Sequence, residues 1–487
     1  MPRFRLGNVI DYNILRNVYW KGSIFRHLEK FSRLIFAMES SGQQSVELFS
    51  NRGLFRLLWP LVIEQLLSVL VGVIDIFMVA YVGEATVSGV ALVDSVNYLF
   101  IQVIFAVTAG GTVVCAQFVG ARDYVSAGKS GAQLALVSTA TMFVVALVFF
   151  IAGPQILSAI FGSVEPDVME SALIYLYFTV ASLPFMALFY SAASVFRAKG
   201  ETRLSMLAAL FMNVINVIGN AICIFGLHMG VVGVALPTLL SRMAASVLMV
   251  WLLQRPSNSL RVQGIGQFKP DYVILRKILS IGLPNGVESG LFNVGKVLLQ
   301  SLVSTLGTPS IAAYAVATSL CTFFYIPGNA FGAGLTTVVG QCYGAKEPLQ
   351  AVGYTKKLLA LNYALAAVLS VIMLAGVHVW VGFYNLSPEA SDLAVGLVVA
   401  HSFAMAVWPT GFLFPYYFRA VGKAVFTMVV AVATMAILRV GLAYLFVAGM
   451  HMNLLWVWYA MIVDWCARTV IYLVAFRREC RKARGSA

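Results

Sequence analysis

Long apolar segments dominate this chain and restrict it to folds that a lipid bilayer can hold. A helix needs about 20 apolar residues to cross the hydrocarbon core, and inside lipid it satisfies its own backbone hydrogen bonds. Only 11% of the residues are charged, compared with about 25% in soluble domains. We therefore predict an all-α integral membrane protein with about twelve spanning helices. The expected spans are residues 53–81, 87–118, 126–151, 168–197, 203–225, 231–254, 271–306, 311–342, 350–377, 390–420, 424–447 and 453–476.

The connections between these segments alternate in charge. One set carries many Lys and Arg residues, whereas the other set, which includes 307–310 and 449–453, carries none. Because basic loops stay in the cytoplasm, we expect a multi-pass protein of the cell (inner or plasma) membrane with both termini cytoplasmic. The formal net charge of +13 then reflects cytoplasmic loops. No basic face indicates nucleic acid as a partner.

Several chemical signatures are absent from the sequence. The six Cys and five His residues form no CxxC or HExxH motif, and there is no GxxxxGK[ST] loop. Those motifs serve redox, zinc or nucleotide chemistry. We therefore expect neither an enzyme nor an ATP-driven pump, and no cofactor other than a coupling ion.

An internal repeat divides the core into two halves. Pro60 and Glu64 recur at one constant offset as Pro284 and Glu288. Each half holds about six helices, an even number, so the halves share one orientation and a pseudo-twofold axis along the membrane normal. Two such bundles can enclose a central cavity and give alternating access when they move. The predicted domains are an N-lobe 51–254, an inter-lobe loop 255–270, a C-lobe 271–478 and a basic cytoplasmic tail 479–487.

Residues 1–50 differ from the rest of the chain because they are basic and contain no apolar segment of signal-peptide type. Two interpretations are open. The segment is either a basic amphipathic arm on the cytoplasmic surface, or upstream sequence read from a start codon assigned too early. Met38 would be a natural start, which leaves open whether residues 1–37 are translated.

The first span, Pro60–Gly83, carries two carboxylates. Glu64 and Asp75 are eleven positions apart, so at about 100° per residue they share one helix face. An ionisable side chain is costly inside a bilayer and marks a functional site by default. We predict that Asp75 binds a coupling cation or a proton.

Polar residues of four spans are predicted to lie at one depth. A rise of about 1.5 Å per residue places them roughly 9–11 Å below the outer surface. They are Asp75, Asp94, Asn220 and Thr238. Asn213 and Asn216 share a helix face with Asn220. Such oxygen ligands suit Na⁺, or a proton with bridging water, and the alternative is that these groups only hydrogen-bond helices together.

Ionisable residues in the later spans are weaker evidence for a functional site. Glu288 and Lys296 lie two turns apart on one helix face, too far for a direct ion pair. Lys296 has three candidate roles: neutralising another carboxylate, repelling a cationic cargo, or forming a structural ion pair. Asp464 and Arg468 have the i, i+4 spacing of a local pair, and we expect Arg439 to join them.

Aromatic residues and prolines mark further candidate positions. Tyr325 and Tyr416 lie in aromatic clusters that can line a pocket for organic cations, although we favour helix packing as their role. Pro60 and Pro284 interrupt helix hydrogen bonding and are potential hinges. Arg242 is expected to extend toward the cytoplasmic interface.

Several motifs of this chain resemble those of one transporter family. They are QxxGA at 117–121 and 341–345, FRAKGETR at 196–203, the Asn-rich fifth span and the Gly-Leu-Pro at the start of the seventh. Together they resemble the MATE (multidrug and toxic compound extrusion) family, whose superfamily also contains flippases for lipid-linked oligosaccharides. The resemblance covers roughly residues 52–478.

The resemblance implies V-shaped N and C lobes and a cation-coupled exporter in which Na⁺ or H⁺ moves in as cargo moves out. It also implies a bend of the first helix at Pro60. The N-lobe cation site of the family would bind Na⁺ here only if transport is sodium-coupled. Its matching positions are Asp75, Asn216, Asn220 and Thr238.

Two departures from the family pattern bear on this site. Asn220 stands where many relatives have Asp, and Asp94 is an acid where an amide is common, so Asp94 would restore the charge. The span 390–420 contains no buried acid, so the C-lobe carboxylate site of some relatives is missing.

Three functions were weighed from the sequence. We expect an H⁺- or Na⁺-coupled antiporter that exports amphipathic, cationic small molecules or drugs. The alternative is a flippase for a lipid-linked oligosaccharide or lipid precursor. A flippase of this kind needs a cationic cavity, and Lys296 is the main residue that would support one. A receptor or enzyme without transport has no catalytic constellation to support it.

The expected partners are the small-molecule cargo and the bilayer, with the protein a monomer. The sequence does not distinguish Na⁺ from H⁺ as the coupling ion and does not identify the cargo. It also does not show whether the protein is in an inward or an outward conformation.

Overall fold

The computed structural model describes residues 47–485 apart from 163 and 256–269. Most of the predicted basic arm and of the inter-lobe loop therefore falls outside the described residues. The chain divides into two compact units, Met1–Arg56 and Leu57–Ala487. Of the first unit, residues 47–56 are described. The candidate site lies entirely in the second unit.

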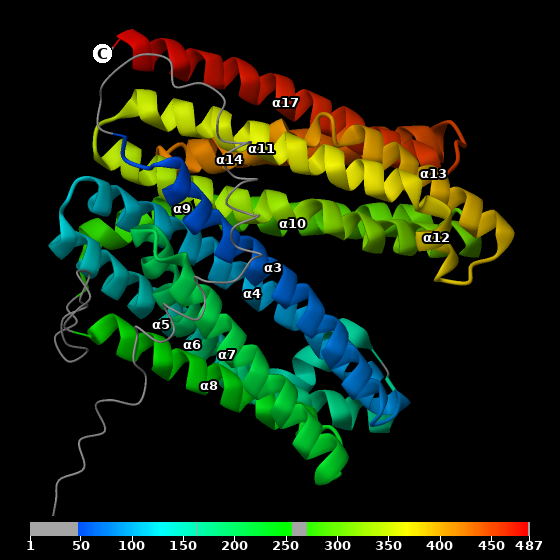
Figure 1. Ribbon diagram of the computed structural model, residues 1–487. Helices are drawn as coiled ribbons and strands as arrows, with labels where there is room; N and C mark the ends of the chain where they lie inside the picture. Colours follow the sequence, from blue (N-terminus) through cyan, green and yellow to red (C-terminus); the bar gives the residue numbers. More distant parts are fainter. Residues whose placement is uncertain (1–46, 163, 256–269, 486–487) are drawn as a thin grey trace, which may run out of the picture. The chain divides into compact units, whose positions relative to one another are not determined.

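Helices form nearly all of the described chain (Figure 1). The first half contains α3 (Asn51–Ala80), α4 (Glu84–Gly120), α5 (Tyr124–Phe161), α6 (Pro166–Lys199), α7 (Thr202–Ala221), η1 (Ile222–Gly226) and α8 (Val232–Gln254). The second half contains α9 (Tyr272–Ser304), α10 (Thr308–Gly344), α11 (Pro348–Ala375), α12 (Val377–Gly382), α13 (Pro388–Ala404), α14 (Trp408–Ala420), α15 (Ala424–Thr434), η3 (Met435–Gly441), α16 (Leu442–Tyr444), η4 (Leu445–Gly449) and α17 (Leu454–Gly485). This architecture confirms the all-α fold class.

The predicted spans can be matched with the helices one by one. Among the described residues, ten helices are long and apolar enough to cross a membrane, and the bent pair α13–α14 would be an eleventh. The remaining predicted span is α9, which is more polar and contains Glu288 and Lys296. Together these segments correspond to the twelve expected spans.

The span predicted over 390–420 consists of two helices rather than one. The chain is bent by 56° between α13 and α14. Pro409 lies at the start of α14, where it has no backbone N–H and disfavours helical geometry in the preceding residue. The Thr469 hydroxyl donates to the Val407 carbonyl at 3.1 Å, which satisfies one of the backbone groups at the break.

The internal repeat reappears in the backbone at the turns between helices. Three pairs of residues at repeat-related positions share a positive φ, a conformation that L-residues other than Asn and Asp adopt only rarely. The pairs are Gly83 and Gly307, Arg122 and Lys346, and Gly200 and Gly422. The two halves therefore use the same turn geometry at the same places.

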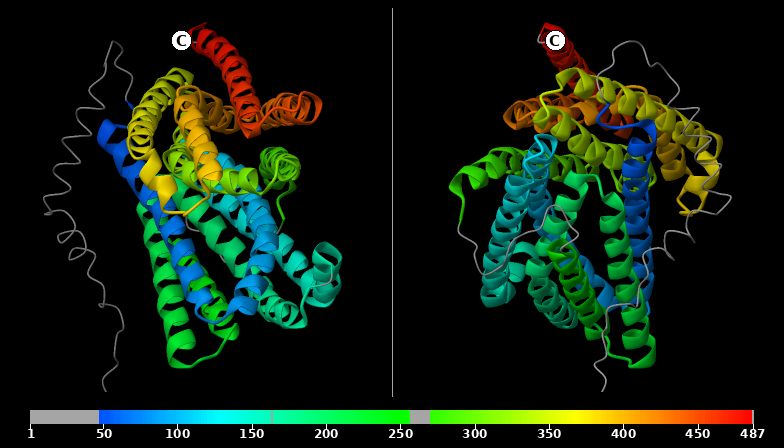
Figure 2. Two further views of the ribbon diagram at one scale, coloured as in Figure 1. Left: turned by 90° about the vertical axis from the view of Figure 1, so that its right-hand side faces the viewer. Right: turned by 60° about the vertical axis from the view of Figure 1, so that its left-hand side comes forward.

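Each half packs as a bundle, and the bundles meet through α4. In the first half α4 packs against α5 and α6, and α8 packs against α6 and α7. In the second half α10 packs against α11, α13 and α14. Helix α4 also contacts α9 and α10 of the second half. Figure 2 shows helices α4 to α8, coloured light blue to green, beside the yellow to red helices of the second half.

Two equivalent hydrogen bonds connect the halves. The Gln117 side chain donates to the Ala420 carbonyl at 2.8 Å, and the Gln341 side chain donates to the Ala198 carbonyl at 2.7 Å. These are the glutamines of the two QxxGA motifs and the alanines of the two FRA motifs. The repeated motifs therefore bind each other across the pseudo-twofold axis.

Glycines allow the backbones to approach at the same place. A Cβ atom at Gly120 would collide with the Gln341 carbonyl, and one at Gly344 would collide with the Gln117 carbonyl. Both glycines end helices at the turns that carry Arg122 and Lys346. The halves are therefore in backbone contact at the end with the basic turns.

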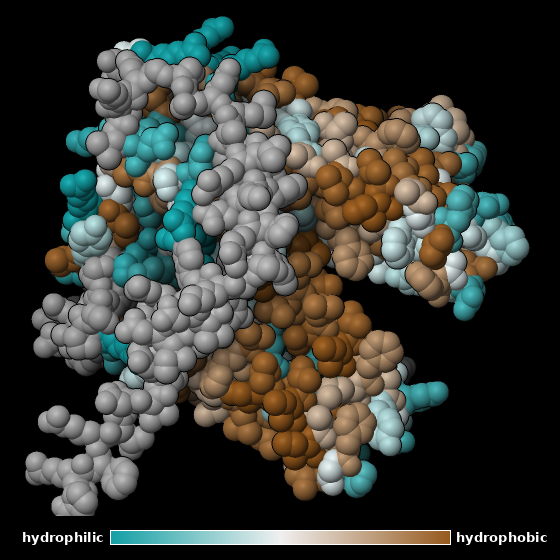
Figure 3. Space-filling model, viewed as in Figure 1, coloured by the Kyte–Doolittle hydropathy of each residue, from teal (hydrophilic) through white to brown (hydrophobic). Residues whose placement is uncertain are grey.

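The surface is hollowed away from these contacts. Figure 3 shows a notch between the two halves at the end opposite the basic turns. Large apolar side chains such as Ile151, Val247 and Val371 are exposed elsewhere on the helices, as expected for a surface that faces lipid.

We predict that Gly120→Ala separates the halves at the basic turns. The added methyl group meets backbone rather than a movable side chain, and overpacking of this kind costs about 1–3 kcal/mol. Gly353→Ala is the matched control because nothing lies within 4 Å of a Cβ there.

The measurement is a spin-label distance between positions 125 and 425, both exposed near the basic turns, in the purified protein. Gly120→Ala should lengthen this distance and Gly353→Ala should not. An unchanged distance distribution in Gly120→Ala would show that this contact does not hold the halves together.

Candidate functional site

A chain of hydrogen bonds connects the predicted site residues of three helices. The Asn220 amide donates to an Asp75 carboxylate oxygen at 3.1 Å and to the Asn216 side-chain oxygen at 3.5 Å. The Asn216 amide in turn donates to the Thr238 hydroxyl at 3.1 Å, and Thr238 donates to the Val234 carbonyl at 2.9 Å. Four residues that the sequence selected from α3, α7 and α8 are thus in direct contact.

The two asparagines in this chain of hydrogen bonds are buried, so their polar atoms need partners within the protein. Asn220 is fully buried and Asn216 is 7% exposed, whereas Asp75 is half-buried. The side-chain oxygen of Asn220 is buried and accepts no hydrogen bond within the described chain. A buried acceptor without a donor is unusual in folded proteins. A cation or a water molecule beside Asp75 would satisfy it.

Asp94 and Arg242 lie around this chain of hydrogen bonds rather than in it. Both are close enough to Asp75 for their charges to interact with it. Asp94 is exposed on α4 and accepts a hydrogen bond from the Tyr175 hydroxyl at 3.3 Å. Arg242 donates to the Ser182 hydroxyl at 2.6 Å. The expectation that Arg242 extends to the cytoplasmic interface is therefore wrong: its guanidinium ends on α6 inside the bundle.

Glu64 occupies a different environment from Asp75 although both belong to α3. It forms an ion pair with Arg197 at 3.5 Å and accepts a hydrogen bond from the Ser205 hydroxyl at 3.3 Å. Arg197 belongs to the FRAKG segment that contacts the other half. Asn213 takes no part in the chain from Asp75 to Thr238. A shared helix face therefore does not bring Glu64 into the candidate site.

The predicted hinges lie within continuous helices. Pro60 is inside α3 and Pro284 is inside α9, and neither helix is interrupted there. Next to Pro284, the Asn285 side chain accepts a hydrogen bond from Arg419. The hinge role of both prolines stays a prediction.

Glu288 and the two tyrosines lie in the second half. Glu288 forms no ion pair with Lys296 in the described part of the chain, and one of its carboxylate oxygens is buried without a hydrogen-bond partner. The Tyr325 hydroxyl lies 3.3 Å from His401 Nε2, and the Arg419 guanidinium lies 4.6 Å from the Tyr416 ring centre. These residues therefore sit among packed side chains of the second half, apart from Asp75.

One ring-to-ring row connects the two tyrosines. Ring centres are 5.2 Å apart from Tyr325 to Trp408, 4.3 Å from Trp408 to Phe412 and 5.8 Å from Phe412 to Tyr416. The two aromatic clusters of the sequence are thus one stack, as helix packing would give.

The Asp464–Arg468 pair forms as predicted, with the Arg468 guanidinium 2.7 Å from the carboxylate. Arg439 is close enough to interact electrostatically with both. It forms no ion pair with Asp464 among the described residues. Arg439 therefore lies near the pair, as expected, but does not contact the carboxylate directly.

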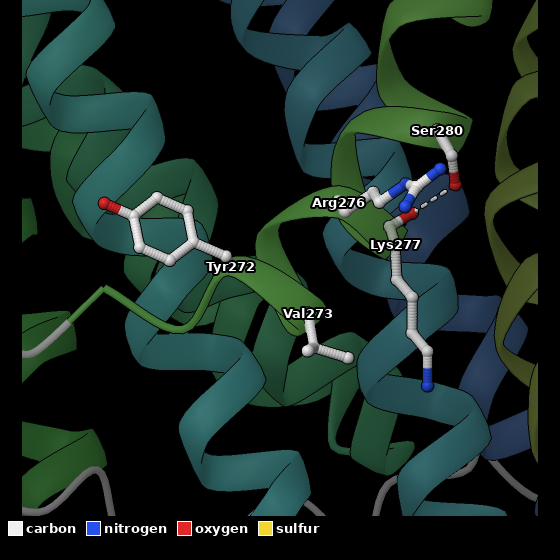
Figure 4. A pocket seen from close by; sticks show the side chains of 5 residues that line it. All are labelled: Tyr272, Val273, Arg276, Lys277 and Ser280. Atoms are coloured by element: carbon white, nitrogen blue, oxygen red, sulfur yellow. Dashed lines mark hydrogen bonds between the residues drawn. The ribbon is translucent and has the colours of Figure 1, made fainter.

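A cavity that the sequence did not indicate lies at the start of α9. Figure 4 shows it lined by the side chains of Tyr272, Val273, Arg276, Lys277 and Ser280. Its volume is about 450 Å³, and the Ser280 hydroxyl donates to the Lys277 carbonyl at 2.8 Å. All five residues come from the first turns of one helix, so the cavity is separate from Asp75.

Known proteins are similar to this chain in both of its halves. A family model described as MatE matches residues 60–222 and 284–445, one match in each half. The uncharacterised transporter YisQ of Bacillus subtilis is 25% identical over 89% of this chain and 96% of its own length. The probable multidrug resistance protein NorM of Thermotoga maritima is 24% identical over 88% of this chain and 92% of its own length.

A solved structure has a similar fold. It is an outward-facing conformation of a multidrug resistance MATE family transporter, with a TM-score of 0.82 at 19% identity. The similarity covers 89% of this chain and 96% of that chain.

We predict that Glu64→Gln destabilises the protein. The substitution leaves the Arg197 guanidinium, whose side chain is 16% exposed, without its carboxylate, at a cost of about 1–3 kcal/mol. Thermal unfolding in detergent measures the loss. Glu84→Gln, which changes an exposed carboxylate, is the control and should leave the unfolding temperature unchanged. Equal unfolding temperatures in the two variants would contradict a structural role for the pair.

Proposed function

Because the chain belongs to the MatE family, whose members are transporters and not enzymes, we propose that it is an H⁺- or Na⁺-coupled antiporter. In this proposal it exports amphipathic small molecules by alternating access. Relatives in the family are described as multidrug transporters, and the apolar spans fit a multi-pass membrane protein. We further propose that both termini face the cytoplasm across the plasma membrane, and that the protein works as a monomer without other cofactors.

The observation that carries the proposal is the hydrogen-bonded chain from Asp75 to Thr238. This chain brings a carboxylate, two amides and a hydroxyl into direct contact within the helix bundle. Such oxygens are ligands for a hard monovalent cation, and a carboxylate with a neighbouring amide also serves a proton. In this proposal Asp75 holds the ion, Asn220 and Asn216 orient it, and Asp94 and Arg242 set the local charge.

Alternating access requires the two halves to separate at one end and to meet at the other. The hydrogen bonds from Gln117 to Ala420 and from Gln341 to Ala198 join the halves at the end with the basic turns. Transport would break and re-form these two bonds in each cycle. Ion binding at Asp75 would then favour one of the two arrangements over the other, because a ligand shifts an equilibrium only through its differential affinity.

The charged residues of the two halves favour different cargo classes. The sequence favoured a cationic cargo, which the acidic residues Asp75 and Asp94 of the first half support. Lys296, Arg439 and Arg468 of the second half favour an acidic group on the cargo instead. The flippase alternative shares that requirement, since a lipid-linked precursor is anionic, and it would act on lipid rather than on soluble compounds.

We predict that Asp75→Asn abolishes ion-driven export while the protein stays folded. The amide keeps the shape and the hydrogen bond to Asn220 but carries no charge for the coupling ion to neutralise. Asp167→Asn, which alters an exposed carboxylate at the start of α6, should transport normally.

Efflux of a fluorescent amphipath from proteoliposomes, driven separately by sodium and by proton gradients, is the measurement. The gradient that drives efflux in the unaltered protein identifies the coupling ion. Unimpaired efflux by Asp75→Asn under that gradient would refute the assignment of Asp75. Transfer of a fluorescent lipid with no efflux of soluble amphipaths would favour the flippase.

A further inference from the structure

Three cationic side chains surround the ring of Phe292 in α9. Lys296 Nζ lies 5.2 Å from the ring centre, the Arg439 guanidinium carbon 5.5 Å and the Arg468 guanidinium carbon 5.6 Å. They come from three separate segments, α9, η3 and α17. Tertiary packing thus collects three positive charges around one aromatic side chain in a membrane-spanning bundle.

Only one of the three has a carboxylate partner among the described residues. Arg468 contacts Asp464 at 2.7 Å, and the Asp464 side chain is fully buried. Lys296 and Arg439 form no ion pair in the described part of the chain. The three cations around Phe292 therefore share one carboxylate, Asp464, which pairs with Arg468 and lies close enough to Arg439 to interact with its charge.

Arg439 shows this lack of a partner most clearly. It is 9% exposed, and its Nε is buried without a hydrogen-bond partner. A guanidinium has five N–H donors, and burying such a donor without a hydrogen-bond partner is unfavourable. Lys296 is close enough to interact unfavourably with it. An anion beside both side chains would offset this repulsion and accept hydrogen bonds from the guanidinium.

The backbone holds the two unpaired cations side by side. Arg439 belongs to the π-helical segment η3, a kind of helical distortion that is frequent at functional sites. Gly295 of α9 packs directly against Met435 of the same segment, so the helices carrying Lys296 and Arg439 are in contact. Packing therefore places the segment that carries the exposed Lys296 against the segment that carries the buried Arg439.

The surroundings of Arg439 are aromatic. Tyr314 and Tyr325 are near enough for their hydroxyls to interact with its charge, and the Tyr314 ring stacks edge-on against Trp458 with centres 5.7 Å apart. An anion with an apolar or aromatic body would fit both the charge and the rings.

We propose that Lys296 and Arg439 bind the acidic group, a carboxylate or a similar anion, of an amphipathic cargo whose apolar body lies against Phe292. The cargo class rests on the proposed export function, but the binding site does not depend on ion coupling. An arginine fork matches a carboxylate in a bidentate manner, and Lys296 adds a point charge. The substrates of this protein would then be organic acids or zwitterions rather than simple cations.

The site can be tested by equilibrium dialysis on the purified full-length protein in neutral detergent, without any ion gradient. The probes are 2-naphthoate and 2-naphthylmethylammonium, which share a ring and differ in charge. The unaltered protein should bind naphthoate more tightly than the ammonium compound. Lys296→Gln and Arg439→Gln should each raise the Kd for naphthoate by about tenfold or more, and Arg439→Lys should raise it less.

Lys129→Gln, which removes an exposed positive charge from α5, is the control and should bind naphthoate normally. Because Arg439 is buried, Lys296→Gln is the second test if Arg439→Gln does not fold, as judged by gel filtration. Equal naphthoate binding by the unaltered protein and by Lys296→Gln would overturn the proposal. So would tighter binding of the ammonium compound.

An anionic lipid could supply the same charge, so the assay is repeated with phosphatidylglycerol and with phosphatidylcholine. Displacement of naphthoate by phosphatidylglycerol alone would assign the site to a lipid headgroup and overturn the cargo assignment. No displacement by either lipid supports a soluble cargo. The assay also separates this proposal from the proposed function, because Asp75→Asn should bind naphthoate normally even if it no longer transports.

Discussion

The hydrogen bond from the Asn220 amide to the Asp75 carboxylate is the interaction on which the candidate site depends. A carboxylate is costly in a bilayer, and an amide donor inside the bundle offsets part of that cost. The bond joins α3 to α7, and the bond from Asn216 to Thr238 continues it to α8. Side chains of three helices are thereby joined, and in our proposal their oxygens bind the coupling ion.

The two halves share a scaffold but differ in the charges that they hold. The residues that repeat, such as Gln117 and Gln341, form the contacts between the halves. Some charged residues do not repeat: Gly72 of α3 and Lys296 of α9 occupy equivalent positions. The first half therefore has Asp75 with its amide partners, whereas the second half has Lys296 and Arg439 around Phe292. This asymmetry suits a transporter in which a coupling cation and an acidic group of the cargo bind in different halves.

The sequence predicted the site better than it predicted the irregular parts of the fold. Asp75, Asn220 and Thr238 could be found because helical rise and span ends fix depth. Pro409 indicated a possible break in the span 390–420, but the 56° bend between α13 and α14 could not be predicted from the apolar pattern of that segment. The position of Arg439 near Asp464 and Arg468 was predicted, but its position beside Phe292 with Lys296 was missed. Burial and counterions there depend on which helices pack together, and that information lies in no single segment.

We propose that the Asp75 carboxyl changes its protonation or ion occupancy when the coupling ion binds. Infrared difference spectroscopy of the purified protein, with sodium addition and pH steps as triggers, measures this directly. We expect a carboxyl band that responds to one of these triggers in the unaltered protein and is absent in Asp75→Asn. The same responsive band in Asp75→Asn would contradict the claim and would place the coupling ion on another carboxylate.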